Sequence, residues 1–104
     1  MIKTRVTIMR RTVIVINIVD GDTFWINKTI KNTRLVRIAN YDSPEKGEPG
    51  YEKESGKLYN LLINKKVVLD IKKKDRYNRL VADIYINDKS LAKMLNKMRQ
   101  RRQL

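Results

Sequence analysis

The sequence has no cysteine and no histidine, and 11 acidic residues stand against 24 lysines and arginines among its 104 residues. The absence of cysteine excludes a small secreted domain held by disulfides, and the absence of both residue types excludes a Cys/His zinc module. Enzymes whose acid, base or nucleophile must be histidine or cysteine are excluded as well. The chemistry that remains available to this chain is that of oxygen groups, nitrogen groups and metal ions.

The sequence also lacks an apolar run near the roughly 20 residues of a membrane-spanning helix. Arg10 and Arg11 precede a short apolar stretch and so imitate an export signal. That stretch has no small-residue cleavage site and continues into Asp20-Gly21-Asp22, so we interpret it as a strand. We expect no membrane partner and a cytoplasmic location.

The formal net charge is +13. A small protein with so strong a positive field attracts polyanions, and the most common such partner is nucleic acid. A chain of about 100 residues buries one modest core. We expect a single domain over residues 1–104, in which 1–11 form a lead-in strand through Val6 and Ile8 and 99–104 form a basic tail.

Runs of β-branched and aromatic residues indicate five strands separated by polar segments. The strands are expected at 12–19, from 23 to 26, at 35–38, at 67–71 and at 80–86. Turns are expected at 27–33 and 72–78. The stretch 40–50 holds both prolines and two of the four glycines, which is typical of a loop.

Two segments have helical spacing of apolar residues. The first combines glutamates in its first turn with leucines three and four residues apart, namely Glu52, Glu54, Leu58, Leu61 and Leu62. The second carries a stripe formed by Leu91, Met94, Leu95 and Met98, which we interpret as core packing. The resulting order β-β-β-α-β-β-α predicts a small, partly open five-stranded barrel of the oligonucleotide-binding (OB-fold) kind, mainly β with α.

Four of the few acidic residues lie where strands end. Asp20 and Asp22 follow the first strand, and Asp42 and Glu45 follow the third. In an up-down-up meander these two ends lie on the same side of the sheet, so the four carboxylates are expected to converge. Carboxylates that converge repel one another unless a cation lies among them, and an all-oxygen ligand set favours Ca²⁺ or Mg²⁺.

Two arginines complete the pattern. Arg37 lies inside the third strand and Arg79 directly precedes the fifth. Forked guanidinium groups bind phosphate oxygens in two places and stay charged at any working pH. Together with a divalent ion they would stabilise the charge that gathers on a phosphodiester during hydrolysis.

Three segments in this order and spacing resemble the staphylococcal nuclease (thermonuclease) family over roughly residues 12–98. They are Asp20-Gly21-Asp22-Thr23, Arg37 followed by Asp42-Ser43-Pro44-Glu45, and Asp75-Arg76-Tyr77-Asn78-Arg79-Leu80-Val81-Ala82. The resemblance implies an OB-fold barrel that carries a calcium-dependent phosphodiesterase site. It also implies a final helix that this chain lacks after Met98, which leaves open a less stable barrel or a homodimer whose second protomer covers the gap.

The resemblance also implies roles for individual residues. Asp22, Asp42 and the main-chain carbonyl of Ser43 would be Ca²⁺ ligands, and Asp20 would be an acid beside the metal. The catalytic residues would be Arg37, Glu45 and Arg79: Glu45 as general base, the two arginines as clamps on the phosphate. Arg76 and Tyr77 would bind the terminal 3′ phosphate of the substrate.

Arg34 competes with Arg37 for the arginine position of this motif. Only Arg37 has the required four residues before Asp42, and an odd separation along a strand places the two side chains on opposite faces. Ser43 and Asn78 stand where the family has threonine and glycine, and both substitutions are compatible with the expected backbone.

Three functional readings follow from the residues. The first is a Ca²⁺-dependent nuclease (hydrolase) of low sequence specificity that acts on single-stranded DNA and/or RNA. The second is a catalytically inactive barrel that only binds nucleic acid and stacks bases on Trp25, Tyr51, Tyr59, Tyr77 or Tyr85. The third places a metal site of the restriction-nuclease kind at Asp70-Ile71-Lys72 with Asp42. Aromatic residues outside the motifs are expected in the core.

Overall fold

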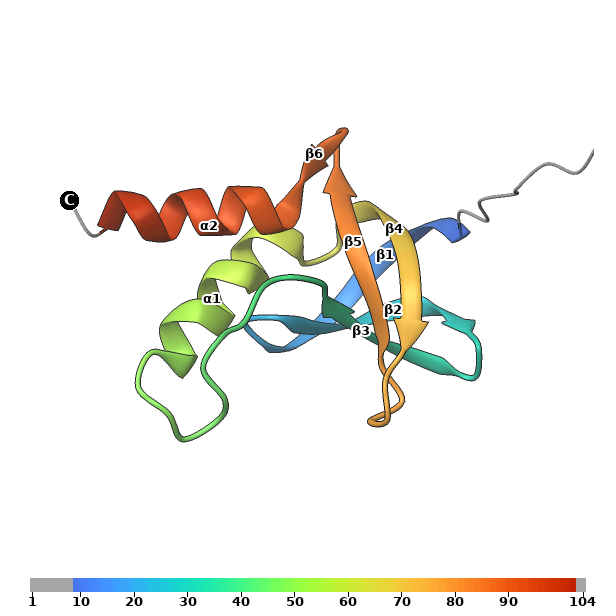
Figure 1. The fold of residues 1–104 in the computed structure, drawn as a ribbon, viewed down its shortest axis with the longest axis horizontal. Coiled ribbons are helices and arrows are strands. Elements are labelled where there is room, and N and C mark those ends of the chain that lie inside the picture. The colour runs from blue at the N-terminus through green and yellow to red at the C-terminus, as the bar shows by residue number, and fades with distance from the viewer. Residues whose placement is uncertain (1–8, 103–104) are drawn as a thin grey trace, which may run out of the picture.

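Residues 9–102, which the computed structural model describes, form six strands and two helices (Figure 1). In chain order these are β1 (Met9–Asp20), β2 (Thr23–Ile30), β3 (Thr33–Ile38), α1 (Tyr51–Leu62), β4 (Lys66–Lys74), β5 (Leu80–Ile86), β6 (Lys89–Ser90) and α2 (Leu91–Arg102). Among the described residues, no helix is long and apolar enough to cross a membrane.

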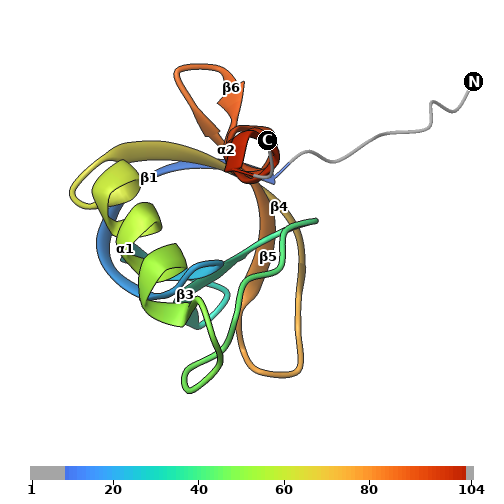
Figure 2. The same cartoon turned by 90° about the vertical axis from the view of Figure 1, so that its left-hand side faces the viewer.

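The strands close into a barrel because β1 is shared by two partners. Residues 9–14 pair with β4 and residues 15–20 pair with β2, both antiparallel, so the one long strand belongs to two parts of the sheet. The order is β3-β2-β1-β4-β5, and a parallel pairing of β3 with β5 completes the ring, seen end-on in Figure 2. The predicted five-stranded barrel is therefore confirmed, and it is closed rather than partly open.

The core follows from the alternation of side chains along the strands. On β2, Phe24 and Ile26 are fully buried while Trp25 between them points outward. Leu58 of α1 and Leu95 of α2 are fully buried against the strands. Leu91, Leu95 and Met98 of the predicted α2 stripe thus pack on the core, whereas Met94 is not part of it.

The first predicted turn is much shorter than expected. β2 continues to Ile30, and only Lys31 and Asn32 form the turn, with φ angles of 50° and 64°. Two consecutive residues with positive φ are typical of a tight hairpin turn. Asn27, which we assigned to the turn, instead accepts a hydrogen bond from the Ile14 amide at 2.9 Å. Its side chain therefore supports the strand pairing that its residue type argued against.

The second predicted turn is also shorter, because β4 continues through Lys74. The remaining connection is held by Asp75, whose Oδ1 accepts hydrogen bonds from the amides of Tyr77 and Arg79 at 2.9 and 3.0 Å. The two-residue strand β6 was not predicted; it pairs with the end of β5 across a turn at Asn87 and Asp88.

Both ends of the described chain differ from expectation. Met9, Arg10 and Arg11 are paired with β4 and belong to β1, whereas Val6 and Ile8 lie outside the described residues. Arg99, expected in a basic tail, lies inside α2. The helix therefore brings a basic side chain back onto the domain.

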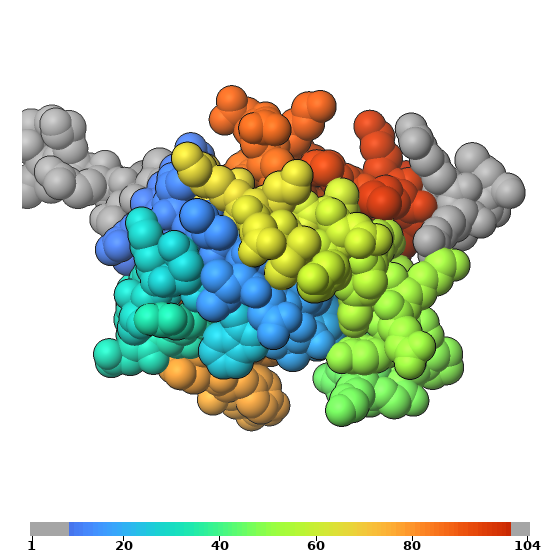
Figure 3. All heavy atoms as spheres, turned by 180° about the vertical axis from the view of Figure 1, so that it is seen from behind, coloured from blue at the N-terminus to red at the C-terminus, as the bar shows by residue number. Residues whose placement is uncertain are grey.

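Two segments project from one side of the barrel. Figure 3 shows the β4–β5 connection (orange) and the loop before α1 (green) as separate lobes along the lower edge of the molecule. The loop spans residues 39–50 and contains Asp42, Ser43 and Glu45. The candidate site lies where this loop meets the β1–β2 turn and the start of β5.

Candidate active site

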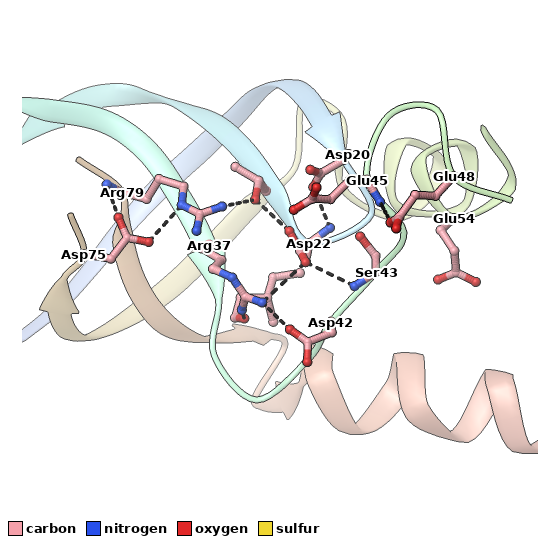
Figure 4. A network of polar contacts seen from close by, with 12 residues as sticks. Asp20, Asp22, Arg37, Asp42, Ser43, Glu45, Glu48, Glu54, Asp75 and Arg79 are labelled. Carbon is pink, nitrogen blue, oxygen red and sulfur yellow. Dashed lines mark hydrogen bonds and ion pairs between the residues drawn. The ribbon is translucent and has the colours of Figure 1, made fainter. Parts of the chain in front are cut away.

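Seven of the nine predicted site residues line one pocket of about 380 Å³, whereas Arg76 and Tyr77 lie outside it. The β1–β2 turn, strand β3, the loop before α1 and the start of β5 all contribute to it (Figure 4). Its lining residues are Asp20, Asp22, Arg37, Asp42, Ser43, Glu45, Glu48 and Arg79. The four carboxylates expected to converge are all among them, so the placement inferred from the meander is reproduced.

Barrel closure brings the two arginines to this pocket. In the parallel pairing of β3 with β5, Arg37 lies opposite Val81. Arg79 is two residues before Val81 and therefore faces the same side of the sheet as Arg37. Two guanidinium groups that are 42 residues apart in the sequence thus lie side by side.

Asp22 is the most buried carboxylate of the pocket, at 7% exposure. Its Oδ1 accepts a hydrogen bond from Thr23 Oγ1 at 2.7 Å, and its Oδ2 accepts one from the Ser43 amide at 3.1 Å. The second bond ties the loop that carries Asp42 to the β1–β2 turn. Asp22 is therefore held in a fixed position by backbone and hydroxyl donors.

Arg37 lies between two carboxylates. Its Nη2 contacts Asp42 Oδ1 in a close ion pair and lies 3.5 Å from Asp22 Oδ2, while its Nη1 donates to the Ile38 carbonyl at 2.7 Å. The two partners differ in freedom, because the Asp42 side chain is 92% exposed and that of Asp22 is 10% exposed. Asp42 can rotate away from Arg37, whereas Asp22 is confined.

Arg79 is aimed into the pocket by its own turn. Its Nε donates to Asp75 Oδ2 at 2.9 Å, and its Nη1 lies 3.4 Å from Thr23 Oγ1. The guanidinium carbon is also 5.3 Å from the centre of the Tyr77 ring. The pKa of Asp75 is lowered: burial alone raises it, but hydrogen bonds from the amide and guanidinium of Arg79 and from the Tyr77 amide outweigh burial.

Glu45 lies at the exposed rim of the same pocket. Its backbone amide donates to Glu48 Oε1 at 2.6 Å, and the Glu48 amide donates back to the Glu45 carbonyl at 2.9 Å. These two bonds make a compact turn that presents the Glu45 carboxylate toward the pocket. Glu48, three residues after Glu45, was not among the predicted site residues.

The carboxyl group of Asp20 has a strongly raised pKa. Burial raises its pKa to about 6, and the neighbouring Asp22 contributes in the same direction through hydrogen bonding and charge repulsion. Asp20 Oδ1 also accepts a hydrogen bond from the Asp22 amide at 3.0 Å. Asp20, which the resemblance places beside the metal, thus lies next to Asp22, one of the expected metal ligands.

Comparison with known proteins identifies the group to which this arrangement belongs. Residues 35–98, more than half of the chain, match the family described as "Staphylococcal nuclease homologue". The chain belongs to the staphylococcal nuclease family. The family match begins at residue 35, so the Asp20–Thr23 motif lies outside it.

Individual relatives have similar but longer chains. A protein named "Uncharacterized endonuclease" from Haemophilus influenzae is 37% identical over 86 residues, which cover 79% of this chain and 46% of the relative. One of the same name from Escherichia coli O157:H7 is 30% identical over 71% of this chain and 48% of its own. An Escherichia coli protein named ParB is 32% identical over 70% of this chain and 41% of its own. The chain thus matches less than half the length of each of these relatives.

Staphylococcal nuclease domains imply a calcium ion, and the donor set here is compatible with one. The candidate ligands are carboxylates and a carbonyl, all hard oxygen donors of the kind that Ca²⁺ prefers. Ser43, whose carbonyl is one of these candidate ligands, also has a buried hydroxyl oxygen, Oγ, without a hydrogen-bond partner among residues 9–102. Within that range, no three acidic side chains already stand close enough to hold an ion. The Arg37 guanidinium lies between the candidate ligands Asp22 and Asp42 and pairs with both of them.

A second polar cluster, which was not predicted from the sequence, holds the loop before α1 in place through contacts with α1 and α2. Arg99 of α2 donates to the Asp42 carbonyl at 2.7 Å and to Glu54 Oε1 at 3.2 Å, and it lies 4.3 Å over the ring of Tyr41. Tyr41 Oη donates to Glu54 Oε1 at 2.7 Å, and Lys57 Nζ donates to Glu54 Oε2 at 3.2 Å. Residues 41–57 and 99 are thereby joined around one nearly buried carboxylate.

Gly21 lets the β1–β2 turn approach this loop closely. A Cβ atom at Gly21 would lie 2.7 Å from Ser43 Cβ and 2.8 Å from Glu54 Cβ, closer than side chains tolerate. The glycine of the Asp-Gly-Asp motif is therefore required for close packing against the loop.

Two further expectations can be compared with the structure. Asp70 does not line the pocket that contains Asp42, and its carboxylate lies 3.5 Å from Lys72, so the restriction-nuclease reading finds no site here. The expectation that aromatic residues outside the motifs are buried is wrong for Trp25 and Tyr59, which are 41% and 47% exposed. Period-two alternation next to buried Phe24 is the signal that predicts an outward Trp25.

Proposed function

We propose that this domain is a nuclease that hydrolyses phosphodiester bonds of single-stranded DNA or RNA with low sequence selectivity and with Ca²⁺ as its metal. The observation that carries the proposal is the single pocket that combines Asp22, Asp42 and Glu45 with the paired guanidiniums of Arg37 and Arg79. Family membership and relatives named as endonucleases support it. The net charge of +13 supports capture of a polyanion.

The proposed metal ligands are Asp22, Asp42 and the carbonyl of Ser43. When bound, the ion would supply Lewis-acid stabilisation of charge on the phosphoryl oxygens. Release of Asp42 from Arg37 would make that carboxylate available and free the guanidinium for substrate. The exposure of the Asp42 side chain supports such a rotation.

The remaining roles belong to the chain's own side chains. Arg37 and Arg79 would hold the non-bridging phosphate oxygens in the two-pronged manner that guanidinium groups favour. Glu45 would accept a proton as a water oxygen forms its bond to phosphorus, while the bond to the 5′ oxygen breaks. Arg79 would stabilise the departing oxygen, and Asp75 keeps its guanidinium oriented for this purpose.

Substitution of Glu45 tests the assignment. Glu45→Gln keeps the size of the side chain but removes the base, so degradation of single-stranded DNA with Ca²⁺ should fall by a factor of about 10²–10⁴. Glu52→Gln is the matched control, because Glu52 is an exposed glutamate that does not line this pocket. Chelation should abolish cleavage by the wild type and by the control.

The alternative function, binding without catalysis, makes a different prediction. A binding-only barrel would retain single-stranded DNA under all these conditions and would cleave it under none. Equal rates for Glu45→Gln and wild type would show that the general base is assigned wrongly. Both outcomes can be read from one gel-based digestion series with and without Ca²⁺.

A further inference from the structure

Trp25 is the only tryptophan of the sequence, and it lies in an unusual position. It lies near the beginning of β2 between two fully buried neighbours, Phe24 and Ile26, yet it is 41% exposed. A large apolar ring on the outer face of a barrel strand contributes nothing to the core that its neighbours build. Exposed aromatic rings of this kind mark binding surfaces when they are joined by other such groups.

Trp25 is joined by other such groups in a pocket of about 250 Å³. Leu35 lies directly opposite Trp25 across the β2–β3 pairing, and Tyr77, which is 62% exposed, contributes a second ring. Polar side chains at the edge are Asn32, Arg34 and Asn78. The pocket therefore combines an apolar floor, two aromatic rings and hydrogen-bonding groups at its rim.

The strand register places this pocket next to the candidate active site. Thr23 and Arg37 form one cross-strand pair, and Trp25 and Leu35 form another pair two residues further along the same two strands. Residues two apart on a strand face the same side, about 7 Å from one another. Trp25 thus stands on the face that carries Arg37, one step away from it.

Tyr77 forms a second connection between the pocket of Trp25 and the active-site pocket. It lines the pocket of Trp25, while the guanidinium of Arg79, which lines the active-site pocket, lies 5.3 Å from the centre of its ring. Arg76 lies over the same ring at 5.2 Å. A chain molecule that lies in the active-site pocket can therefore continue past Tyr77 toward Trp25 without leaving the protein surface.

We propose that Trp25 stacks a nucleobase of the bound single strand, next to the phosphate held by Arg37 and Arg79. This inference rests on the proposed function, since it takes the strand in the active-site pocket to be nucleic acid. A nucleobase is a planar ring with hydrogen-bonding edges, which matches an aromatic floor bordered by two asparagines and an arginine. The flanking phosphates match the basic side chains Arg34 and Arg76.

Fluorescence of the single tryptophan tests the proposal directly. The whole protein is titrated with a short oligothymidylate in chelator, so that no cleavage occurs, and with an oligonucleotide of equal length and charge that lacks its internal bases. Anisotropy of a label on each oligonucleotide reports binding independently. Stacking predicts strong quenching by oligothymidylate and little quenching by the abasic oligonucleotide at equal occupancy. Equal quenching by both, or none by either, overturns the proposal.

Substitutions supply a second measurement. Trp25→Ala should weaken binding of oligothymidylate by a factor between about 5 and about 150, the range observed when one stacking ring is removed, and Trp25→Phe should retain most of the affinity. Tyr59→Ala is the control, because Tyr59 is an exposed ring on α1 that lines neither pocket. Far-ultraviolet circular dichroism verifies that each variant is folded. A Trp25→Ala variant that binds within about two-fold of wild type overturns the proposal.

The two proposals fail in different ways. Base-dependent quenching without any Ca²⁺-dependent cleavage would reject the nuclease assignment and leave the stacking site intact. Ca²⁺-dependent cleavage without base-dependent quenching would reject the stacking site and leave the nuclease assignment intact.

Discussion

The carboxylate of Glu54 offers the sharpest test of how the loop before α1 is held. It is 9% exposed and accepts hydrogen bonds from Tyr41, Lys57 and Arg99. Glu54→Gln keeps the shape of the side chain but removes its charge and replaces one acceptor oxygen by a donor NH₂ group. At least one of the three donors then faces another donor.

The expected loss of stability follows from these three bonds. Hydrogen bonds to a charged group contribute roughly 1.5–3 kcal/mol each, and glutamine can still satisfy some of the donors. We therefore expect the free energy of unfolding of Glu54→Gln to fall by about 2–3 kcal/mol at pH 7. This is a large part of the roughly 5–15 kcal/mol that holds a typical domain folded.

Urea denaturation measures this loss, and Glu52→Gln is its control. Glu52 lies in the same first turn of α1, so both substitutions remove the same favourable charge at the helix N-terminus, which contributes about 0.3–1 kcal/mol. The difference between the two variants isolates the cluster around Glu54. A difference below about 0.5 kcal/mol would refute the reasoning.

The stabilisation by the Glu54 carboxylate should also depend on pH. Burial alone raises the pKa of Glu54, but the hydrogen bonds from Tyr41, Lys57 and Arg99 outweigh burial and lower the pKa. A carboxyl group whose pKa is lower in the folded state stabilises the fold fully above its unfolded pKa of about 4.3. That stabilisation is lost as the pH falls through the folded value. The gap between wild type and Glu54→Gln should therefore shrink on acidification below about pH 4, and a constant gap would contradict the assignment.

Two further predictions concern backbone positions and are read from urea midpoints. Gly21→Ala forces a Cβ atom to within 2.7 Å of Ser43 and should lower the free energy of unfolding by about 1–3 kcal/mol. Gly56 lies in a helix with open space around it, so Gly56→Ala should raise the free energy of unfolding by about 0.5–1 kcal/mol. Asn78 has a φ of 63°, so Asn78→Gly should be nearly neutral and Asn78→Val should destabilise by about 1–2 kcal/mol. Equal midpoints within either pair would contradict the geometry described for that site.

Local patterns in the sequence predicted most of the secondary structure. β-branched runs located the strands, leucine spacing located the helices, and the proline- and glycine-rich stretch located the loop before α1. Predicted strand boundaries were wrong where a polar residue belongs to a strand. Asn27 is an example, because its side chain accepts a hydrogen bond from the Ile14 amide of the neighbouring strand. A residue type indicates turn or strand only on average. For Asn27 the deciding contact is with Ile14, which lies 13 positions away in the sequence.

The placement of the site could be predicted in part. The expectation that the first and third strands end on the same side of the sheet placed Asp20, Asp22, Asp42 and Glu45 at one pocket, as the structure has them. The ion pair of Arg37 with Asp42, the cluster of Tyr41, Glu54 and Arg99, and the closeness of Gly21 to Ser43 could not be predicted. Each depends on how far apart two elements pack, which no spacing within one segment encodes.

The sequence alone therefore determined the elements, the charge and the residue types available for chemistry, because these follow from neighbours along the chain. Only the tertiary structure decided which distant groups meet. Parallel pairing of β3 with β5 places Arg37 beside Arg79, and antiparallel pairing of β2 with β3 places Leu35 beside Trp25. Both result from non-local hydrogen bonding between strands, whose partners are chosen by the packing of the whole core.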